Sequence, residues 1–62
     1  MNRADLRDAA RDATMLGIDD QLSGRRARSG DAVMAAAVKG LHNISPRERG
    51  TIIGSYREGY RG

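Results

Sequence analysis

The sequence predicts an all-α fold, with three helices in a single small domain that spans residues 1–62. Three observations lead to this prediction. Apolar residues recur at spacings of three and four, which is typical of helices, and no stretch alternates as a strand would. A serine, a proline and a glutamate at 45–48 form a strong helix-start signal. A segment rich in glycine and arginine, 23–30, separates two helical patterns and is predicted to be a loop.

The first predicted helix covers residues 3–16, with Asn2 as its N-cap. Its apolar residues form one stripe: Leu6, Ala9, Ala10, Ala13 and Leu16. The next large apolar side chains fall on another side of the helix: Met15, Ile18 and Leu22. Because the register changes there, we expect the helix to end or kink at Gly17. The alternative is a continuous helix to Leu22, in which the glycine would cost roughly 1 kcal/mol.

The second predicted helix covers 32–42, with Asp31 as its N-cap. One side is covered by apolar residues, namely Val33, Met34, Ala37, Val38 and Leu41. Alanines leave the opposite side nearly featureless, and a helix that is apolar almost all round is usually buried. A chain of 62 residues offers little in which to bury it. We therefore expect this helix to mediate self-association, giving a homodimer.

The third predicted helix begins at the capping box of Ser45, Pro46 and Glu48 and runs to about Tyr60. Its apolar stripe consists of Ile52, Ile53, Tyr56 and Tyr60. Three glycines interrupt it, Gly50, Gly54 and Gly59, and together they cost on the order of 2 to 3 kcal/mol relative to alanine. Gly50 and Gly54 share a bare strip, where we expect close helix packing. Approach of a ligand or nucleic acid and fraying of the helix are the alternatives.

The composition excludes several classes of protein. With no cysteine and one histidine, His42, no disulfide and no structural metal site are expected. His42 is expected to face solvent or cap a helix, and Asp19 and Asp20 point to different sides and are expected to cap a turn. No phosphate-binding glycine loop is present, so we expect neither an enzyme nor a cofactor or small-molecule substrate. Without a long apolar run, the chain is expected to be soluble and cytoplasmic.

Arginine accounts for ten of the eleven basic residues, and the net charge is +3. Residues 1–22 carry a charge of −2 and residues 23–62 carry +5. Guanidinium groups suit phosphates and carboxylates, so the arginines are the candidate sites for nucleic acid or an acidic partner. These sites are Arg25, Arg26 and Arg28 in the loop, Arg57 and Arg61 in the last helix, and Arg3, Arg7 and Arg11 in the first. For each set a solvated surface is the alternative, and Asp8 can pair locally with Arg11.

Two stretches resemble the ribosome modulation factor family of small basic bacterial proteins. Residues 13–17, followed by Leu22-Ser23-Gly24-Arg25, are similar to the first helix of that family, and residues 52–58 are similar to its second. The resemblance implies two antiparallel helices and binding to ribosomal RNA, with Arg25 and Arg57 as the matched basic positions. The chain departs from the family in the inserted segment 32–41 and in having Arg47 after Pro46, where the family has an aromatic residue.

Two functions are consistent with these features. The first is a non-enzymatic protein that binds RNA or a ribonucleoprotein surface through arginines, mainly by contacts to the phosphate backbone, because Tyr56 and Tyr60 are the only aromatic residues. The second is an inhibitor or regulator of the kind phages and plasmids encode, which would self-associate and bind an acidic host protein. A toxin–antitoxin or DNA-binding regulator is a further alternative, although no recognition helix follows the helix that starts at Ser45.

Overall fold

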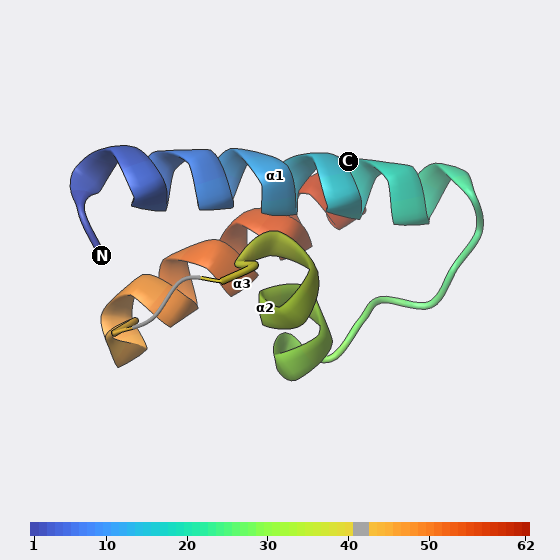
Figure 1. Ribbon diagram of the computed structural model, residues 1–62. Helices are drawn as coiled ribbons and strands as arrows, with labels where there is room; N and C mark the ends of the chain where they lie inside the picture. The colour runs from blue at the N-terminus through green and yellow to red at the C-terminus, as the bar shows by residue number, and fades with distance from the viewer. Residues whose placement is uncertain (41–42) are drawn as a thin grey trace.

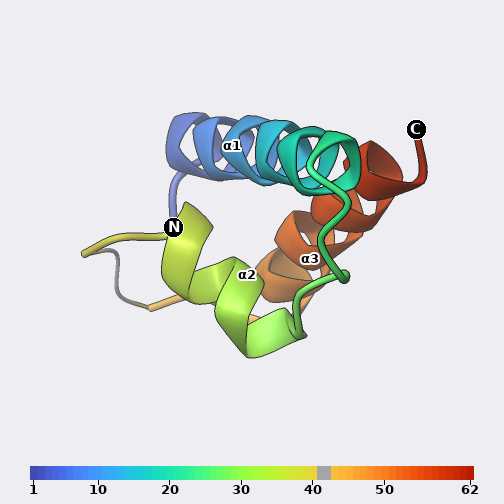
Figure 2. The ribbon, with the colours of Figure 1, turned by 90° about the vertical axis from the view of Figure 1, so that its right-hand side faces the viewer.

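The computed structural model describes residues 1–40 and 43–62, and within them it contains three helices and no strand. The helices are α1 (Arg3–Leu22), α2 (Gly30–Ala37) and α3 (Pro46–Arg61). The long helix α1 crosses α3, and the short helix α2 packs against both (Figures 1 and 2). The predicted all-α class with three helices is therefore confirmed. None of the described helices is long and apolar enough to cross a bilayer.

The first helix is continuous from Arg3 to Leu22. The side chain of Asn2 accepts a hydrogen bond from the backbone nitrogen of Asp5 at 2.8 Å, which confirms the predicted N-cap. The predicted end or kink at Gly17 is wrong, and the continuous alternative is right. Gly17 is buried in the middle of this helix, where it faces α3. The change of apolar register therefore marks two faces of one helix and does not mark its end.

The second helix is shorter than the sequence pattern predicts and is capped by a different residue. Ser29 is the N-cap, with its hydroxyl accepting from the backbone nitrogen of Ala32 at 3.2 Å, so the prediction that Asp31 caps the helix is wrong. The Asp31 carboxylate instead accepts a hydrogen bond from Arg49 of α3 at 2.6 Å. The helix ends at Ala37, since Val38 leaves the helical conformation. Leu41 and His42, which the prediction placed at its end, lie outside the described residues.

The third helix starts as predicted. The Ser45 hydroxyl accepts from the backbone nitrogen of Glu48 at 3.1 Å, and the Glu48 carboxylate accepts from the backbone nitrogen of Ser45 at 2.9 Å. Both halves of the capping box are present, with Pro46 in the first turn. The helix runs to Arg61, one residue past the predicted end.

The core combines small side chains of α1 with larger ones of the other helices. It consists of Ala9, Ala13, Val33, Val38, Ile52 and Tyr56. Two of the residues predicted for self-association, Val33 and Val38, are thus buried within one chain, while Met34 and Ala37 are partly buried against the same core. The large apolar side chains that remain exposed lie instead on α1, at Met15, Ile18 and Leu22. Self-association through the apolar face of α2 stays a prediction, and Val33 has no accessible surface left for it.

The closest contact between helices is made where Gly17 of α1 meets Gly59 of α3. A Cβ added at Gly59 would lie 3.0 Å from the carbonyl carbon of Thr14, and one added at Gly17 would lie 2.7 Å from the backbone nitrogen of Tyr60. Real Cβ atoms are not tolerated so close to the backbone, so both positions require glycine for this crossing. The two backbones are in direct contact here.

The two long helices run in the same general direction. Near their N-terminal ends, the Met1 amino group donates to the Glu48 carboxylate at 3.2 Å, and further along Gly17 lies against the last turns of α3. Figure 1 shows both helices passing from the same side of the molecule to the other. The resemblance to ribosome modulation factor implies antiparallel helices, and the pair formed by α1 and α3 differs from that arrangement.

The bare strip of Gly50 and Gly54 faces open space. Within the described part of the chain, nothing lies within 4 Å of a Cβ placed at either position. The sequence predicted that another helix packs closely against this strip. Within the described residues of one chain that prediction is wrong for both glycines. The glycine of α3 that does pack closely is Gly59.

The two kinds of glycine on α3 give a matched test. We expect Gly59→Ala to lower the free energy of unfolding by about 1 to 3 kcal/mol, because the new methyl group meets the backbone of Thr14. Gly54→Ala, in the same helix, should instead raise it by about 0.5 to 1 kcal/mol through helix propensity. Urea unfolding followed by circular dichroism measures both. Equal effects of the two substitutions would contradict the described crossing.

Candidate nucleic-acid interface

A buried carboxylate attaches the arginine-rich loop to both long helices. Asp20, near the end of α1, is only 3% exposed. It accepts hydrogen bonds from the guanidinium of Arg28 at 2.7 and 3.2 Å and from the hydroxyl of Tyr56 at 2.7 Å. The same hydroxyl accepts a hydrogen bond from the backbone nitrogen of Arg28 at 2.9 Å. Asp20, Arg28 and Tyr56 therefore form one cluster, in which α1, the loop and α3 each supply one residue.

The ionisation of this cluster follows from its hydrogen bonds. The Arg28 guanidinium first, and the Tyr56 hydroxyl second, lower the pKa of Asp20 from its ordinary 3.8 to about 2. The hydrogen bond to Asp20 raises the pKa of Arg28, and burial raises the pKa of Tyr56. At neutral pH the cluster is an ion pair with a neutral phenol, and every buried polar side-chain atom in the described residues has a hydrogen-bond partner. The loop is thus held by a fully satisfied polar contact.

This cluster changes the role of one predicted binding residue. Arg28 was a candidate for an external anion, but its guanidinium is paired with Asp20 inside the fold. Asp20 was expected only to cap a turn. Its position was readable in the sequence, because it follows Ala9, Ala13 and Gly17 at spacings of four, four and three and so falls on the buried face of α1. A carboxylate on that face needs a partner, and the sequence does not say which arginine supplies it.

The other loop arginines lie beside the end of α3. The hydroxyl of Tyr60 donates to the carbonyl oxygen of Arg25, which fastens the loop to the last turn of that helix. Arg25 and Arg26 are exposed, as are Arg57 and Arg61 of α3. In the described part of the chain these four side chains form no ion pair. The fold therefore collects four of the predicted binding arginines at one end of the molecule.

The arginines of α1 are separate from this group. Arg3, Arg7 and Arg11 lie on the N-terminal half of the helix and are exposed. Arg11 donates to the Asp8 carboxylate at 3.0 Å, so the local pair considered from the sequence is confirmed. Both partners of this pair are largely exposed, and such a pair contributes little to stability. The described structure gives the first-helix arginines no role in the interface formed by the loop and α3.

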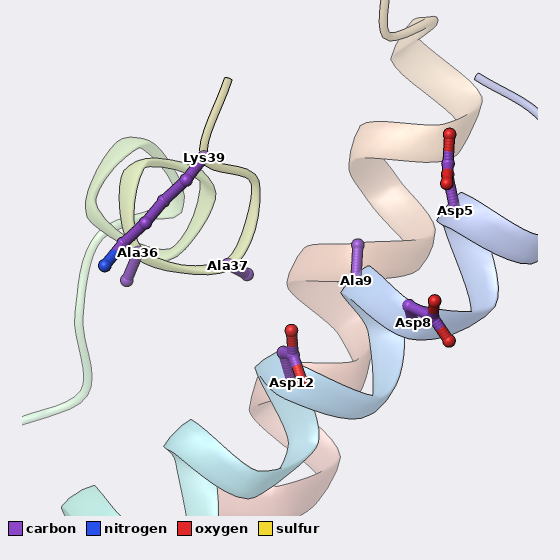
Figure 3. A pocket seen from close by; sticks show the side chains of 7 residues that line it. All are labelled: Asp5, Asp8, Ala9, Asp12, Ala36, Ala37 and Lys39. Carbon is purple, nitrogen blue, oxygen red and sulfur yellow. The ribbon is translucent and has the colours of Figure 1, made fainter. Parts of the chain in front are cut away.

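A groove of about 390 Å³ lies between α1 and α2 and is acidic. Figure 3 shows Asp5, Asp8 and Asp12 on the α1 side, while Ala36, Ala37 and Lys39 line the side formed by α2 and the residues after it. Its charge is opposite to that of the arginine group. Within residues 1–40 and 43–62, no three histidine, aspartate or glutamate side chains are arranged to hold a metal ion.

Comparisons of the chain with family models, with curated proteins and with solved structures find no match. The candidate interface therefore rests on its own residues and geometry.

The hydroxyl of Tyr56 can be tested against that of Tyr60. Tyr56→Phe removes the buried donor to Asp20 and the acceptor of the Arg28 backbone nitrogen, and we expect a loss of about 1 to 3 kcal/mol of unfolding free energy. Tyr60→Phe removes one exposed hydrogen bond and should cost about 0.5 to 1 kcal/mol. Urea unfolding measures both. If Tyr60→Phe were the more damaging change, the buried cluster would not be the main attachment of the loop.

Stability should depend on pH through Asp20. Its pKa is lower in the folded chain than in the unfolded chain, so its contribution is present above about pH 4 and is lost as the pH falls towards 2. We expect the stability difference between wild type and Asp20→Asn to shrink over that range. Glu48, whose pKa is also lowered, titrates in both proteins and cancels in the difference. Urea unfolding at several pH values measures the difference in unfolding free energy between wild type and Asp20→Asn. A difference that does not change with pH would contradict the ion pair.

Proposed function

We propose that this chain is a non-enzymatic protein that binds RNA or a ribonucleoprotein surface through Arg25, Arg26, Arg57 and Arg61. The observation that carries the proposal is the attachment of the loop to the end of α3, which brings these four exposed, unpaired guanidinium groups to one end of the described fold. Asp19 and Glu58 are exposed nearby, so the four arginines leave this end positively charged. A planar guanidinium binds a phosphate through two hydrogen bonds, which lysine cannot do.

The contacts proposed are to the phosphate backbone and not to bases. Tyr56 is buried, and its ring lies 6.0 Å from that of Tyr60 in a stacked arrangement. The hydroxyls of both residues are occupied within the chain. Few aromatic faces are therefore free to stack on bases, and binding is expected to tolerate many sequences and to weaken with salt.

The outer face of α3 also supports this proposal. Gly50, Gly54, Arg57 and Arg61 follow one another at spacings of four, three and four, so they share one side of the helix. The two glycines lower helix stability, and no packing within the described chain requires them. Their absent side chains would let a phosphate backbone approach the helix in the turns before Arg57 and Arg61.

Ribosomal RNA is the first target to test. The two basic positions that match the ribosome modulation factor pattern, Arg25 and Arg57, both belong to the exposed group of four. Residues 32–37 of the segment that departs from that pattern lie in α2, which packs against α1 and α3 (Figure 2).

Fluorescence anisotropy with a labelled single-stranded RNA tests the proposal. We expect the variant with Arg25, Arg26, Arg57 and Arg61 all changed to Ala to lose affinity by about ten-fold or more at moderate salt. The slope of log affinity against log salt should fall by roughly 0.7 for each phosphate contact removed. Duplex DNA and a ribosomal RNA fragment serve as competitors that distinguish the target.

The control is Arg3→Ala with Arg7→Ala, which removes two exposed arginines from the other region and should change affinity less than three-fold. A second variant, Gly50→Ala with Gly54→Ala, should bind more weakly although its fold is more stable. Equal losses of binding free energy per arginine removed, in the four-arginine variant and in the control, would mean that binding follows net charge alone. That result would overturn the assigned interface.

A protein-binding regulator is the second candidate, and one observation favours it. Met15, Ile18 and Leu22 expose a strip of apolar surface on α1, which RNA binding does not use. Capture of one host protein from lysate, unchanged by nuclease and lost in Leu22→Ser, would support this function. Capture that nuclease abolishes would instead support the first.

A further inference from the structure

The outer face of α3 carries arginines towards both of its ends and glycines in between. The line consists of Arg47, Gly50, Gly54, Arg57 and Arg61. Spacings of three, four, three and four place these residues on one side of the helix, opposite its buried residues Ile52, Tyr56 and Gly59. Arg47, in the first turn, has no part in the interface described so far.

Arg47 has the same surroundings as the four arginines of the proposed interface. It is exposed, and it forms no ion pair within residues 1–40 and 43–62. With a rise of about 1.5 Å per residue, its Cα lies about 15 Å from that of Arg57 and about 21 Å from that of Arg61 along the helix axis. One phosphate cannot contact arginines so far apart. A ligand that uses the whole line therefore presents phosphates at two separate places.

Carboxylates leave this face positively charged. Glu58 is exposed and borders the line beside Arg57. Glu48 lies on the other side of the helix, where it accepts hydrogen bonds from the backbone nitrogen of Ser45 and from the Met1 amino group. Three guanidinium groups on the outer face thus stand against one exposed carboxylate.

We propose that the target of this protein is double-stranded RNA, with α3 lying across the minor groove. The arginines of the loop and of the C-terminal end of α3 contact phosphates of one strand, and Arg47 contacts phosphates of the other. The bare strip of Gly50 and Gly54 lets the helix approach the groove between them. This inference rests on the proposed function and names the class of nucleic acid that the site takes.

The two tyrosines argue against a single strand as the preferred target. Proteins that bind single strands stack bases on aromatic side chains. Here Tyr56 is buried, and Tyr60 stacks on it and donates its hydroxyl proton to the loop. Duplex RNA is bound mainly through its shape, its phosphates and its 2′-hydroxyl groups, which requires no stacking.

The shape of the face favours RNA over DNA. The minor groove of an RNA duplex is wide and shallow, so a helix can lie on it. The minor groove of B-form DNA, about 6 Å wide, is too narrow for a helix about 10–12 Å across. In the wider major groove of DNA, a helix reads base edges with its side chains. The line on α3 has no side chain between Arg47 and Arg57 for such contacts.

Fluorescence anisotropy with three labelled nucleic acids tests the inference: an RNA duplex, one of its strands alone, and the DNA duplex of the same sequence. We expect the RNA duplex to bind at least about five-fold more tightly than the other two. Arg47→Ala should weaken binding to the RNA duplex by about five-fold and lower its salt slope by about one, but weaken single-strand binding less than about two-fold. Arg61→Ala removes one exposed arginine from the same face and is the matched control, which should weaken binding to both RNAs.

Circular dichroism confirms that both variants are folded, which is expected because both side chains are exposed. A loss confined to the duplex in Arg47→Ala supports the crossing of the groove. Equal affinity for duplex and single strand, equal affinity for duplex RNA and duplex DNA, or an Arg47→Ala variant that changes both RNAs alike would overturn this inference and leave the proposed function standing. If wild type binds neither RNA but binds poly-glutamate, the partner is an acidic protein and the proposed function is wrong as well.

Discussion

The buried ion pair between Asp20 and Arg28, with the hydroxyl of Tyr56 bonded to both residues, is the contact on which the arrangement of this small protein depends. A buried carboxylate without partners would be strongly unfavourable, so the loop has to stay where Arg28 can reach it. That requirement fixes the path of the chain from α1 to α2. It also holds Tyr56 in the core and brings Tyr60 to the carbonyl of Arg25. The contacts of Arg28 with Asp20 and of Arg25 with Tyr60 therefore give this loop of small and charged residues a defined position.

The direct crossing of two backbones compensates for the small size of the core. Gly17 and Gly59 allow α1 and α3 to touch, so that alanines of α1 are sufficient to fill the space beside Ile52 and Tyr56. The short helix α2 then closes the remaining side of the core with its two valines. Because α3 and α2 cover only one side of α1, the opposite side remains in solvent with its three large apolar residues.

The arginines divide into two groups by what the fold provides for them. Arg11, Arg28 and Arg49 each have a carboxylate partner within the chain. The other seven arginines form no ion pair in the described residues, and the proposed interface consists of four of them: Arg25, Arg26, Arg57 and Arg61. The chemistry of the residue is the same in both groups. Proximity of an aspartate decides which guanidinium groups are paired within the chain, and position at the loop and the end of α3 distinguishes the four proposed for an external anion.

The sequence by itself determined the helical class, the N-caps at Asn2 and Ser45 and the start of α3, because capping and helical spacing depend on residues within one turn of each other. It also located the exposed basic loop and the pairing of Arg11 with Asp8. Tertiary structure alone decided that α1 continues through Gly17, that Gly59 and not Gly50 or Gly54 packs closely, and that Arg28 turns inward to Asp20. It also decided that Val33 and Val38 enter the core of one chain. These outcomes depend on contacts between residues eight or more positions apart in the sequence, and a pattern of local spacing does not determine such contacts.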